Sequence, residues 1–216
     1  MRPFSYKLYL VTDEAACLGR DLVSVVEAAV KGGVDMVQLR EKDLPDAAFL
    51  AKALRLKEML DRYQVPLIIN DNLKVAVQCG AMGIHVGNND MTPESILKHW
   101  TTCGTLGYSL EYEEHLQSTS AQLADYLALS PVFETPTKTD TVTAWGLEGI
   151  SRIREQTAKP LVAIGQVSAA NAGAILQAGA DCLAVVSAIC SAPDPSYAAE
   201  ILRNEIEKHA RPDRKI

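Results

Sequence analysis

Gly32-Gly33-Val34-Asp35, followed directly by the apolar run at 36–39, is the stretch of sequence that decides the fold. A glycine at the end of a helical pattern is typical of a helix C-terminus, and here the chain enters the next strand at once. The same arrangement recurs at 79–83, as Cys-Gly-Ala-Met-Gly, and at 178–181, as Ala-Gly-Ala-Asp. The recurrence predicts a series of strand–helix units built on one plan.

Working outward from this stretch, eight short runs rich in aliphatic residues are found at 8–11, 36–39, 67–69, 83–86, 105–108, 126–129, 161–164 and 182–186. Most are continuously apolar, as expected of parallel strands buried on both faces. Helical patterns lie between them at 22–30, 46–62, 111–120, 147–156 and 169–178. Eight units in 216 residues fit an α/β protein of the (β/α)8 TIM-barrel class. A flavodoxin-like sheet would leave about three units unused.

The bulk properties fit one domain over residues 1–216, with its core at about 8–208 and a short polar tail. The net charge of −6 gives no broad positive surface for nucleic acid or membrane, so a few local cations must hold any anionic ligand. No apolar stretch reaches the roughly 18 residues of a membrane span. The five cysteines are scattered without a CxxC pair, which favours a reducing, cytoplasmic location.

Polar residues follow the predicted strands, at the barrel end where TIM-barrel enzymes place their sites. They are Gln38, Arg40 and Lys42 after the second strand, Asn70 and Asp71 after the third, 85–90 after the fourth, Ser109 after the fifth, 134–140 after the sixth, Gly165 and Gln166 after the seventh, and Ser187 after the eighth. We therefore expect these side chains to meet at one mouth.

Arg40 and Lys42 lie two residues apart on an extended segment, so their side chains point the same way. A planar guanidinium beside a mobile ammonium is a common phosphate-binding pair. The alternative is a solvated charged loop with internal salt bridges of little energetic value.

Asp71 and Asp90 end neighbouring strands, and two carboxylates brought together repel unless a cation lies between them. Oxygen ligands without a nearby cysteine favour Mg²⁺, which often bridges to substrate phosphates. The alternative makes Asp71 the N-cap of a helix that begins near Leu73. Asp90 could likewise be a cap, although Thr92 is the stronger candidate for that role.

A second anion subsite is expected across the mouth, where the turn at Gly165 and the helix opening at Ser187 follow the last two strands. The long polar loop that carries Thr135, Thr137 and Lys138 would cover the bound anion. His85 is interpreted as a packed wall residue rather than a catalytic base.

The segments VQLREKD, IINDNLKVA, GIHVGNND, SPVFETPTKTD, GLEGI, VAIG and AVVSAI occur in this order, and together they resemble the thiamine-phosphate synthase family. The resemblance covers about residues 8–200. It implies a TIM barrel that joins hydroxymethylpyrimidine diphosphate to a thiazole phosphate, giving thiamine phosphate and pyrophosphate by a Mg²⁺-assisted dissociative displacement. A homodimer is compatible with it.

The resemblance also implies roles for individual residues. The pyrimidine diphosphate would be held by Gln38, Arg40, Lys42, Asn70, Ser109 and Lys138, of which Arg40, Lys42 and Lys138 would act in catalysis. Mg²⁺ would be held by Asp71 and Asp90. The thiazole phosphate would be held by Thr135, Thr137, Gly165, Gln166, Val186 and Ser187.

The chain departs from the family pattern in three places. Gln166 stands where a second glycine is usual, and a side chain would cost on the order of 1 kcal/mol if that position needs a positive φ. After the fifth strand the chain reads Tyr108-Ser109-Leu110-Glu111, with an acid where a histidine is common, and Asn88 replaces a frequent glutamine.

Two other functions compete with the synthase hypothesis. A thiazole tautomerase uses the same barrel but would not require the diphosphate set of Arg40, Lys42, Asn70, Asp71, Asp90 and Lys138. A barrel that only binds a phosphorylated metabolite is suggested by Gln166 and by the altered end of the fifth strand.

Overall fold

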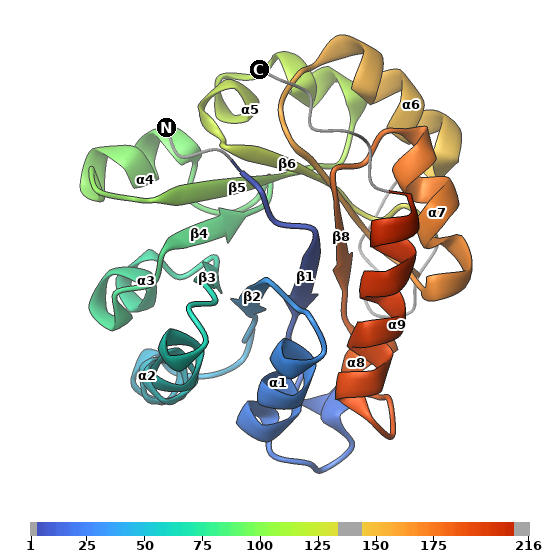
Figure 1. Ribbon diagram of the computed structural model, residues 1–216. Coiled ribbons are helices and arrows are strands. Elements are labelled where there is room, and N and C mark those ends of the chain that lie inside the picture. The colour runs from blue at the N-terminus through green and yellow to red at the C-terminus, as the bar shows by residue number, and fades with distance from the viewer. Residues whose placement is uncertain (1–3, 134–143, 210–216) are drawn as a thin grey trace.

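The structure is a computed structural model that describes residues 4–133 and 144–209. Eight parallel strands hydrogen-bond in sequence order and close into a barrel, with β1 paired to both β2 and β8 (Figure 1). The strands are β1 (Leu8–Val11), β2 (Met36–Leu39), β3 (Leu67–Asn70), β4 (Gly83–Val86), β5 (Thr105–Leu110), β6 (Tyr126–Leu129), β7 (Leu161–Ile164) and β8 (Cys182–Val185). The predicted (β/α)8 TIM barrel is confirmed.

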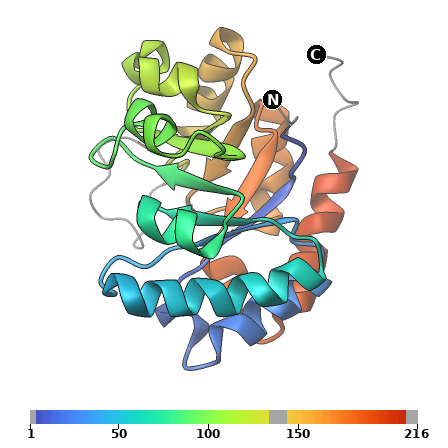
Figure 2. The same ribbon diagram turned by 90° about the vertical axis from the view of Figure 1, so that its left-hand side faces the viewer.

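Helices cover the outside of the barrel (Figures 1 and 2). They are α1 (Leu22–Lys31), α2 (Asp46–Arg62), α3 (Leu73–Cys79), α4 (Pro93–His99), α5 (Thr119–Leu123), α6 (Gly146–Gln156), α7 (Ala169–Ala178), α8 (Ser187–Cys190) and α9 (Pro195–Lys208), with the 3₁₀ turns η1 (Ala15–Cys17) and η2 (Glu113–Gln117). Figure 2 shows the long α2 running along the side of the molecule beside α3.

One predicted helix, at 111–120, is wrong: it is two short helices rather than one. The pattern at 111–120 folds as η2 and then α5, because Ser118 has an extended backbone at φ −69° and ψ 154° that interrupts the helix. Its side chain accepts a hydrogen bond from Ala121 N, so Ser118 caps α5 instead of continuing the preceding turn. Thr92 caps α4 in the same way, as predicted.

The glycines of the recurring stretch have the conformation that the sequence predicts. Gly33, Gly80 and Gly179 follow α1, α3 and α7 with φ of +108°, +65° and +130°, a region that other residues enter at a cost. Gly32 meets a second demand, because a Cβ there would lie 2.1 Å from the Ser196 carbonyl oxygen of α9. The first strand–helix unit therefore packs against the last helix through backbone contact.

Two apolar cores follow from the alternation of side chains along the strands. Leu8 and Leu10 point outward into the layer between barrel and helices, whereas Tyr9 and Val11 point into the barrel. The inner core consists of Tyr9, Val11, Met36, Ile68, Tyr126, Ala128, Val162, Cys182 and Ala184. Part of this core, including Tyr9, Val11 and Ala128, also lines a cavity at the carboxyl ends of the strands.

Helices in the described residues are too short or too polar to cross a membrane. All five cysteines are free thiols, and only Cys103 is not fully buried.

Candidate active site at the barrel mouth

A cavity of about 420 Å³ opens at the carboxyl ends of the strands, a size typical of small-molecule sites. Eleven residues predicted from the sequence line it: Gln38, Arg40, Lys42, Asn70, Asp71, Asp90, Ser109, Gly165, Gln166, Val186 and Ser187. The predicted meeting of these side chains at one mouth is confirmed. Thr135, Thr137 and Lys138 lie outside the described residues.

One side of the mouth is cationic. Arg40 is half-buried, and its backbone N donates to the fully buried Thr12 Oγ1 at 3.1 Å, which fixes the end of β2 against β1. Lys42 is exposed. Over 4–133 and 144–209, neither Arg40 nor Lys42 forms an ion pair, and both side chains line the cavity.

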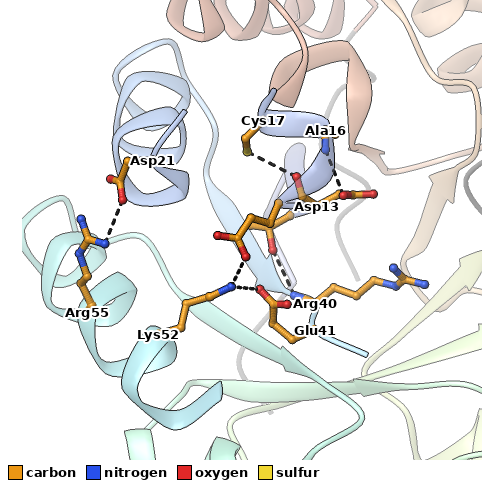
Figure 3. Close-up of polar contacts among 10 residues, drawn as sticks. Asp13, Ala16, Cys17, Asp21, Arg40, Glu41, Lys52 and Arg55 are labelled. Atoms are coloured by element: carbon orange, nitrogen blue, oxygen red, sulfur yellow. Dashed lines mark hydrogen bonds and ion pairs between the residues drawn. The ribbon is translucent and has the colours of Figure 1, made fainter. Parts of the chain in front are cut away.

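Glu41 lies between these two cations in the sequence, yet it pairs elsewhere. Its carboxylate accepts a hydrogen bond from Lys52 Nζ of α2 at 2.6 Å, and the same ammonium binds Glu14 at 2.5 Å. Figure 3 shows Lys52 beside Glu41, with the Arg40 guanidinium extending away from both. The internal salt bridges expected of a merely solvated loop do not occur in these residues; the loop is instead tied to α2.

Two carboxylates adjoin the cations. Burial and the neighbouring Asp90 carboxylate raise the pKa of Asp71 to about 7, although Lys42 and Arg40 oppose the shift. Asn70 Nδ2 donates to Asp71 Oδ2, and Asp90 Oδ2 accepts from Gly87 N at 2.8 Å. A carboxyl pair with one raised pKa is the arrangement that a cation would relieve.

The alternative role of Asp71 as a helix cap is wrong. Asn72 is the N-cap of α3, since its side chain accepts from Val75 N at 2.9 Å, and Asp71 precedes it with φ +60°. The left-handed backbone turns the Asp71 carboxylate away from the helix and toward the cavity.

The donor set suits Mg²⁺ better than a metal that needs a protein cage. Among the residues described, no group of three or more histidine, cysteine, aspartate or glutamate side chains could hold a metal. Mg²⁺ often takes only one or two carboxylates and fills its shell with water and substrate phosphate oxygens. Asp71 and Asp90 fit that requirement.

The opposite side of the mouth is built from backbone turns. Gly165 has φ +110°, and a Cβ there would lie 2.6 Å from Pro131 Cβ. Gln166 follows with φ +54°, so the position does require the left-handed conformation that glycine adopts freely. Asn171 holds the turn by donating to Gln166 O at 2.8 Å and accepting from Ser168 N at 2.8 Å.

Ser187 begins the one-turn helix α8 next to this turn. Val186 and Ser187 both line the cavity, so the ends of β7 and β8 together form its second wall. This is the position at which barrels of this class commonly bind phosphate.

A hydrogen-bonded chain of side chains forms the floor. Gln38 Nε2 donates to Tyr9 Oη at 2.7 Å, Tyr9 Oη lies 3.0 Å from Tyr126 Oη, and Tyr126 Oη lies 3.0 Å from His85 Nδ1. His85 Nε2 lies 2.9 Å from Ser109 Oγ. The interpretation of His85 as a packed, hydrogen-bonded wall residue agrees with this arrangement.

Sequence reasoning missed Tyr9, Tyr126 and Thr12. The tyrosines stand in the middle of apolar strands, where an aromatic residue ordinarily signals only core packing. The available signal was their place in the alternation, because Tyr9 shares a strand face with Val11, directed into the barrel.

Two departures from the family pattern contact each other. Tyr108 is buried on the outer face of β5, and its hydroxyl donates to Asn88 Oδ1 in the loop after β4. A residue longer than asparagine at position 88 would crowd this phenol, so the two departures fit as a pair. Glu111 lies after β5 and does not line the cavity.

Comparisons with known proteins agree with the resemblance. A family model described as thiamine monophosphate synthase matches residues 8–189. The chain is 49% identical over 201 residues to a thiamine-phosphate synthase of Albidiferax ferrireducens, covering 93% of this chain and 92% of that protein. It is 44% identical to a thiamine-phosphate synthase of Leptospira biflexa, covering 92% and 96%.

Solved structures give the same result. A thiamine phosphate pyrophosphorylase from Pyrococcus furiosus superimposes with a TM-score of 0.87 at 30% identity, covering 96% of this chain and 98% of that one. A 3-hexulose-6-phosphate synthase, at a TM-score of 0.70 and 18% identity, shares the fold alone. With a family model over most of its length and relatives this similar across almost their whole length, the chain belongs to the thiamine monophosphate synthase family.

Proposed function

We propose that this protein is a thiamine-phosphate synthase, which couples hydroxymethylpyrimidine diphosphate to a thiazole phosphate and releases pyrophosphate. The observation that carries the proposal is the two-sided cavity. Two cations and a pair of carboxylates lie on one side of the cavity. The backbone of a glycine-containing turn and the start of a helix lie on the other side, and the cavity has a volume of about 420 Å³. A site with two anion-binding ends suits two phosphorylated substrates better than the single thiazole phosphate of a tautomerase.

The cationic side would bind and release the diphosphate. Arg40 and Lys42 would neutralise the charge that develops on the diphosphate oxygens as the carbon–oxygen bond to the pyrimidine methylene breaks. Lys138, which is outside the described residues, would be a third cation by the family resemblance. Asn70 would donate a hydrogen bond to the same end of the substrate.

Asp71 and Asp90 would hold Mg²⁺ beside these cations. When bound, Mg²⁺ would neutralise the leaving diphosphate and orient it. The two carboxylates must be ionised to do this, and Asn70 and the Gly87 backbone N–H orient them by hydrogen bonds.

The remaining chemistry needs positioning more than acid–base work. Loss of the diphosphate leaves a pyrimidine-stabilised carbocation, and the thiazole ring nitrogen supplies the electron pair that forms the new carbon–nitrogen bond. No side chain has to act as a nucleophile. The protein must hold the two substrates in line and keep water away from the cation.

The far wall would hold the thiazole phosphate. Backbone N–H groups of the turn at Gly165 and Gln166, together with Val186 and Ser187, are the proposed ligands, with Thr135 and Thr137 added by the family resemblance. The orientation of the second substrate would then follow from where its phosphate is bound.

We also propose a cytoplasmic location and a homodimer. The five free thiols suit a reducing compartment. Fractionation of cells and light scattering of the purified protein test these two points directly.

The decisive experiment measures pyrophosphate release with both substrates, with each alone, and with and without Mg²⁺. We expect release only when both substrates and the metal are present, with formation of thiamine phosphate in equal amount. Isomerisation of the thiazole phosphate by the protein alone would instead identify a tautomerase. Binding without turnover would identify a barrel that has lost the reaction.

A further inference from the structure

The hydrogen-bonded chain beneath the cavity joins five side chains, of which Tyr126 alone is absent from the cavity lining. Gln38 and Ser109 are the ends, and Tyr9, Tyr126 and His85 connect them from β1, β6 and β4. All five residues are at most 8% exposed. Each bond is between 2.7 and 3.0 Å long, the normal range for a well-formed hydrogen bond.

The hydrogen-bonded chain can be assigned a direction, from donor to acceptor, starting at Gln38. Gln38 contributes its Nε2, which can only donate, so Tyr9 accepts there and is free to donate its own proton to Tyr126. Tyr126 can then donate to His85 Nδ1, an arrangement that requires the His85 proton on Nε2, facing Ser109 Oγ. In this direction each link has one donor and one acceptor, and the Ser109 hydroxyl is left to donate toward the cavity.

Both phenols keep their protons, which the direction requires. Burial raises the pKa of Tyr9 and that of Tyr126 well above the ordinary value for tyrosine. Each hydroxyl therefore offers one proton to its neighbour in the chain.

We infer that this chain is a positioning device that fixes the hydrogen-bonding character of the cavity floor, with Gln38 Oε1 as acceptor and the Ser109 hydroxyl as donor. The inference rests on the proposed function and deepens it. The matching ligand edge carries a donor and an acceptor, as an aminopyrimidine does in its amino group and ring nitrogen. A ring with a carbonyl in place of the amino group would present the opposite pattern. Tyr126 thus determines specificity without touching the substrate.

Gly107 shows how closely the chain is built into the fold. A Cβ at this position of β5 would lie 2.3 Å from Tyr126 Oη and 2.4 Å from His85 Nδ1. The bond between Tyr126 and His85 therefore passes directly over a residue with no side chain. A side chain at position 107 would therefore collide with both partners of this hydrogen bond.

The first test reads the histidine tautomer without any substrate. In the wild-type protein labelled with ¹⁵N-histidine, we expect His85 to carry its proton on Nε2. In Tyr126→Phe, Nδ1 loses its donor, and we expect the proton to move to Nδ1 or to exchange between the two nitrogens. A wild-type His85 protonated on Nδ1 would overturn the inferred direction.

The second test separates ring recognition from diphosphate recognition. We expect Tyr126→Phe to weaken binding of hydroxymethylpyrimidine diphosphate about tenfold, because Ser109 would then donate to His85. Pyrophosphate with Mg²⁺ should bind as in the wild type, and discrimination against the carbonyl analogue should shrink. Equal loss for both ligands, or no loss for either, would overturn the inference.

Tyr108→Phe is the matched control. It also removes a buried tyrosine hydroxyl, but on the outer face of β5 and bonded to Asn88 rather than to this chain. We expect neither the tautomer of His85 nor ring affinity to change. If the wild type bound pyrophosphate but not the pyrimidine diphosphate, the proposed function would fail, while the tautomer measurement would still decide the direction of the chain.

Discussion

Gln166 is exposed at the barrel mouth, with the left-handed backbone of a residue type that rarely adopts it. We expect Gln166→Gly to lower the KM for the thiazole phosphate and to leave the KM for the pyrimidine diphosphate unchanged, since the turn could approach the phosphate more closely. The melting temperature should change little, because relief of about 1 kcal/mol of strain is offset by the greater entropy of an unfolded glycine. Steady-state kinetics with one substrate varied at a time measures both constants.

Gln64→Gly provides the control. Gln64 follows α2 with nearly the same conformation, φ +57°, and is exposed without lining the cavity. Its replacement should leave both KM values unchanged. Loss of activity in Gln166→Gly alone would show instead that the glutamine amide is a substrate ligand.

The raised pKa of Asp71 predicts a pH-dependent metal affinity. With a pKa of about 7, a proton competes with Mg²⁺ below neutrality, so the apparent dissociation constant should be about tenfold larger at pH 6 than at pH 8. Calorimetric titration at the two pH values measures this. Asp71→Asn should bind weakly at both, and an equal affinity of the wild type at both pH values would contradict the prediction.

The same shift affects stability in the absence of metal. Between about pH 4 and 7 the folded protein retains a proton on Asp71 that the unfolded chain has lost. This carboxyl group therefore stabilises the folded state at low pH, and its contribution is lost as pH rises toward 7. Asp71→Asn should remove that part of the pH dependence of unfolding.

At the scale of single residues, the sequence predicted which side chains meet but not what each one contacts. Arg40 and Lys42 could be placed from strand ends and side-chain alternation. The pairing of Glu41 with Lys52 could not, because Lys52 lies on a helix whose rotation about its axis is set by packing. Tyr126 was missed for a different reason: the alternation along its strand indicates a side chain directed into the barrel, but not that its hydroxyl is hydrogen-bonded to Tyr9 and His85.

At the scale of elements, α2 places the Lys52 ammonium at the edge of the site, where it pairs with Glu41 and does not line the cavity. Lys52 holds Glu41 away from Arg40 and Lys42, and we expect Lys52→Met to free that carboxylate to pair with them. The KM for the diphosphate substrate should rise severalfold, because an ion pair would have to break before the diphosphate binds. The KM for the thiazole phosphate should stay the same.

Arg55→Met is the matched control on the same helix. Arg55 pairs with Asp21 at 2.9 Å (Figure 3), but its side chain is 64% exposed and does not line the cavity. An exposed pair contributes little to stability. Neither KM should change, and equal effects of the two substitutions would show that Lys52 acts only through the stability of α2.

The helices and strands were predictable wherever a continuous apolar run or a helical period specified them. Their ends were predictable wherever capping residues marked them. β5 runs two residues beyond its predicted end, to Leu110, because pairing with β6 continues there. The break at Ser118 was missed because the helical pattern on both sides of it is continuous. Tertiary pairing and a single cap decided these cases.

At the scale of the whole molecule, ligands that bind only the closed barrel should stabilise it. At a free concentration of 100 times the Kd, Mg²⁺ and pyrophosphate together should add about 2.7 kcal/mol. For a domain of this size that corresponds to an increase in Tm of roughly 5–10 °C. Differential scanning calorimetry with both ligands, and with each alone, measures the effect.

Asp71→Asn combined with Asp90→Asn should abolish the part of this increase that depends on Mg²⁺. Pyrophosphate alone should still stabilise the double variant through Arg40 and Lys42. An unchanged response to Mg²⁺ would contradict the assignment of the two carboxylates.

The barrel architecture was the most predictable feature, because eight apolar runs in a chain of 216 residues are compatible with few other folds. The sequence could not supply the size of the cavity or the hydrogen-bonded floor, both of which depend on how strands far apart in the chain pack together. Thr135, Thr137 and Lys138 remain predictions from the family resemblance.

The two ends of the connection that carries these three residues are already joined. Trp145 N donates to Pro131 O at 3.0 Å, and Gly146 N donates to Val132 O at 2.8 Å, so residues 131–132 and 145–146 form a closed base. Loop-closure entropy changes by only about 0.6 kcal/mol for each doubling of loop length. The connection can therefore be lengthened, shortened or exchanged at a small cost in the free energy of folding. A segment with different substrate contacts could be introduced there while the barrel stays unchanged.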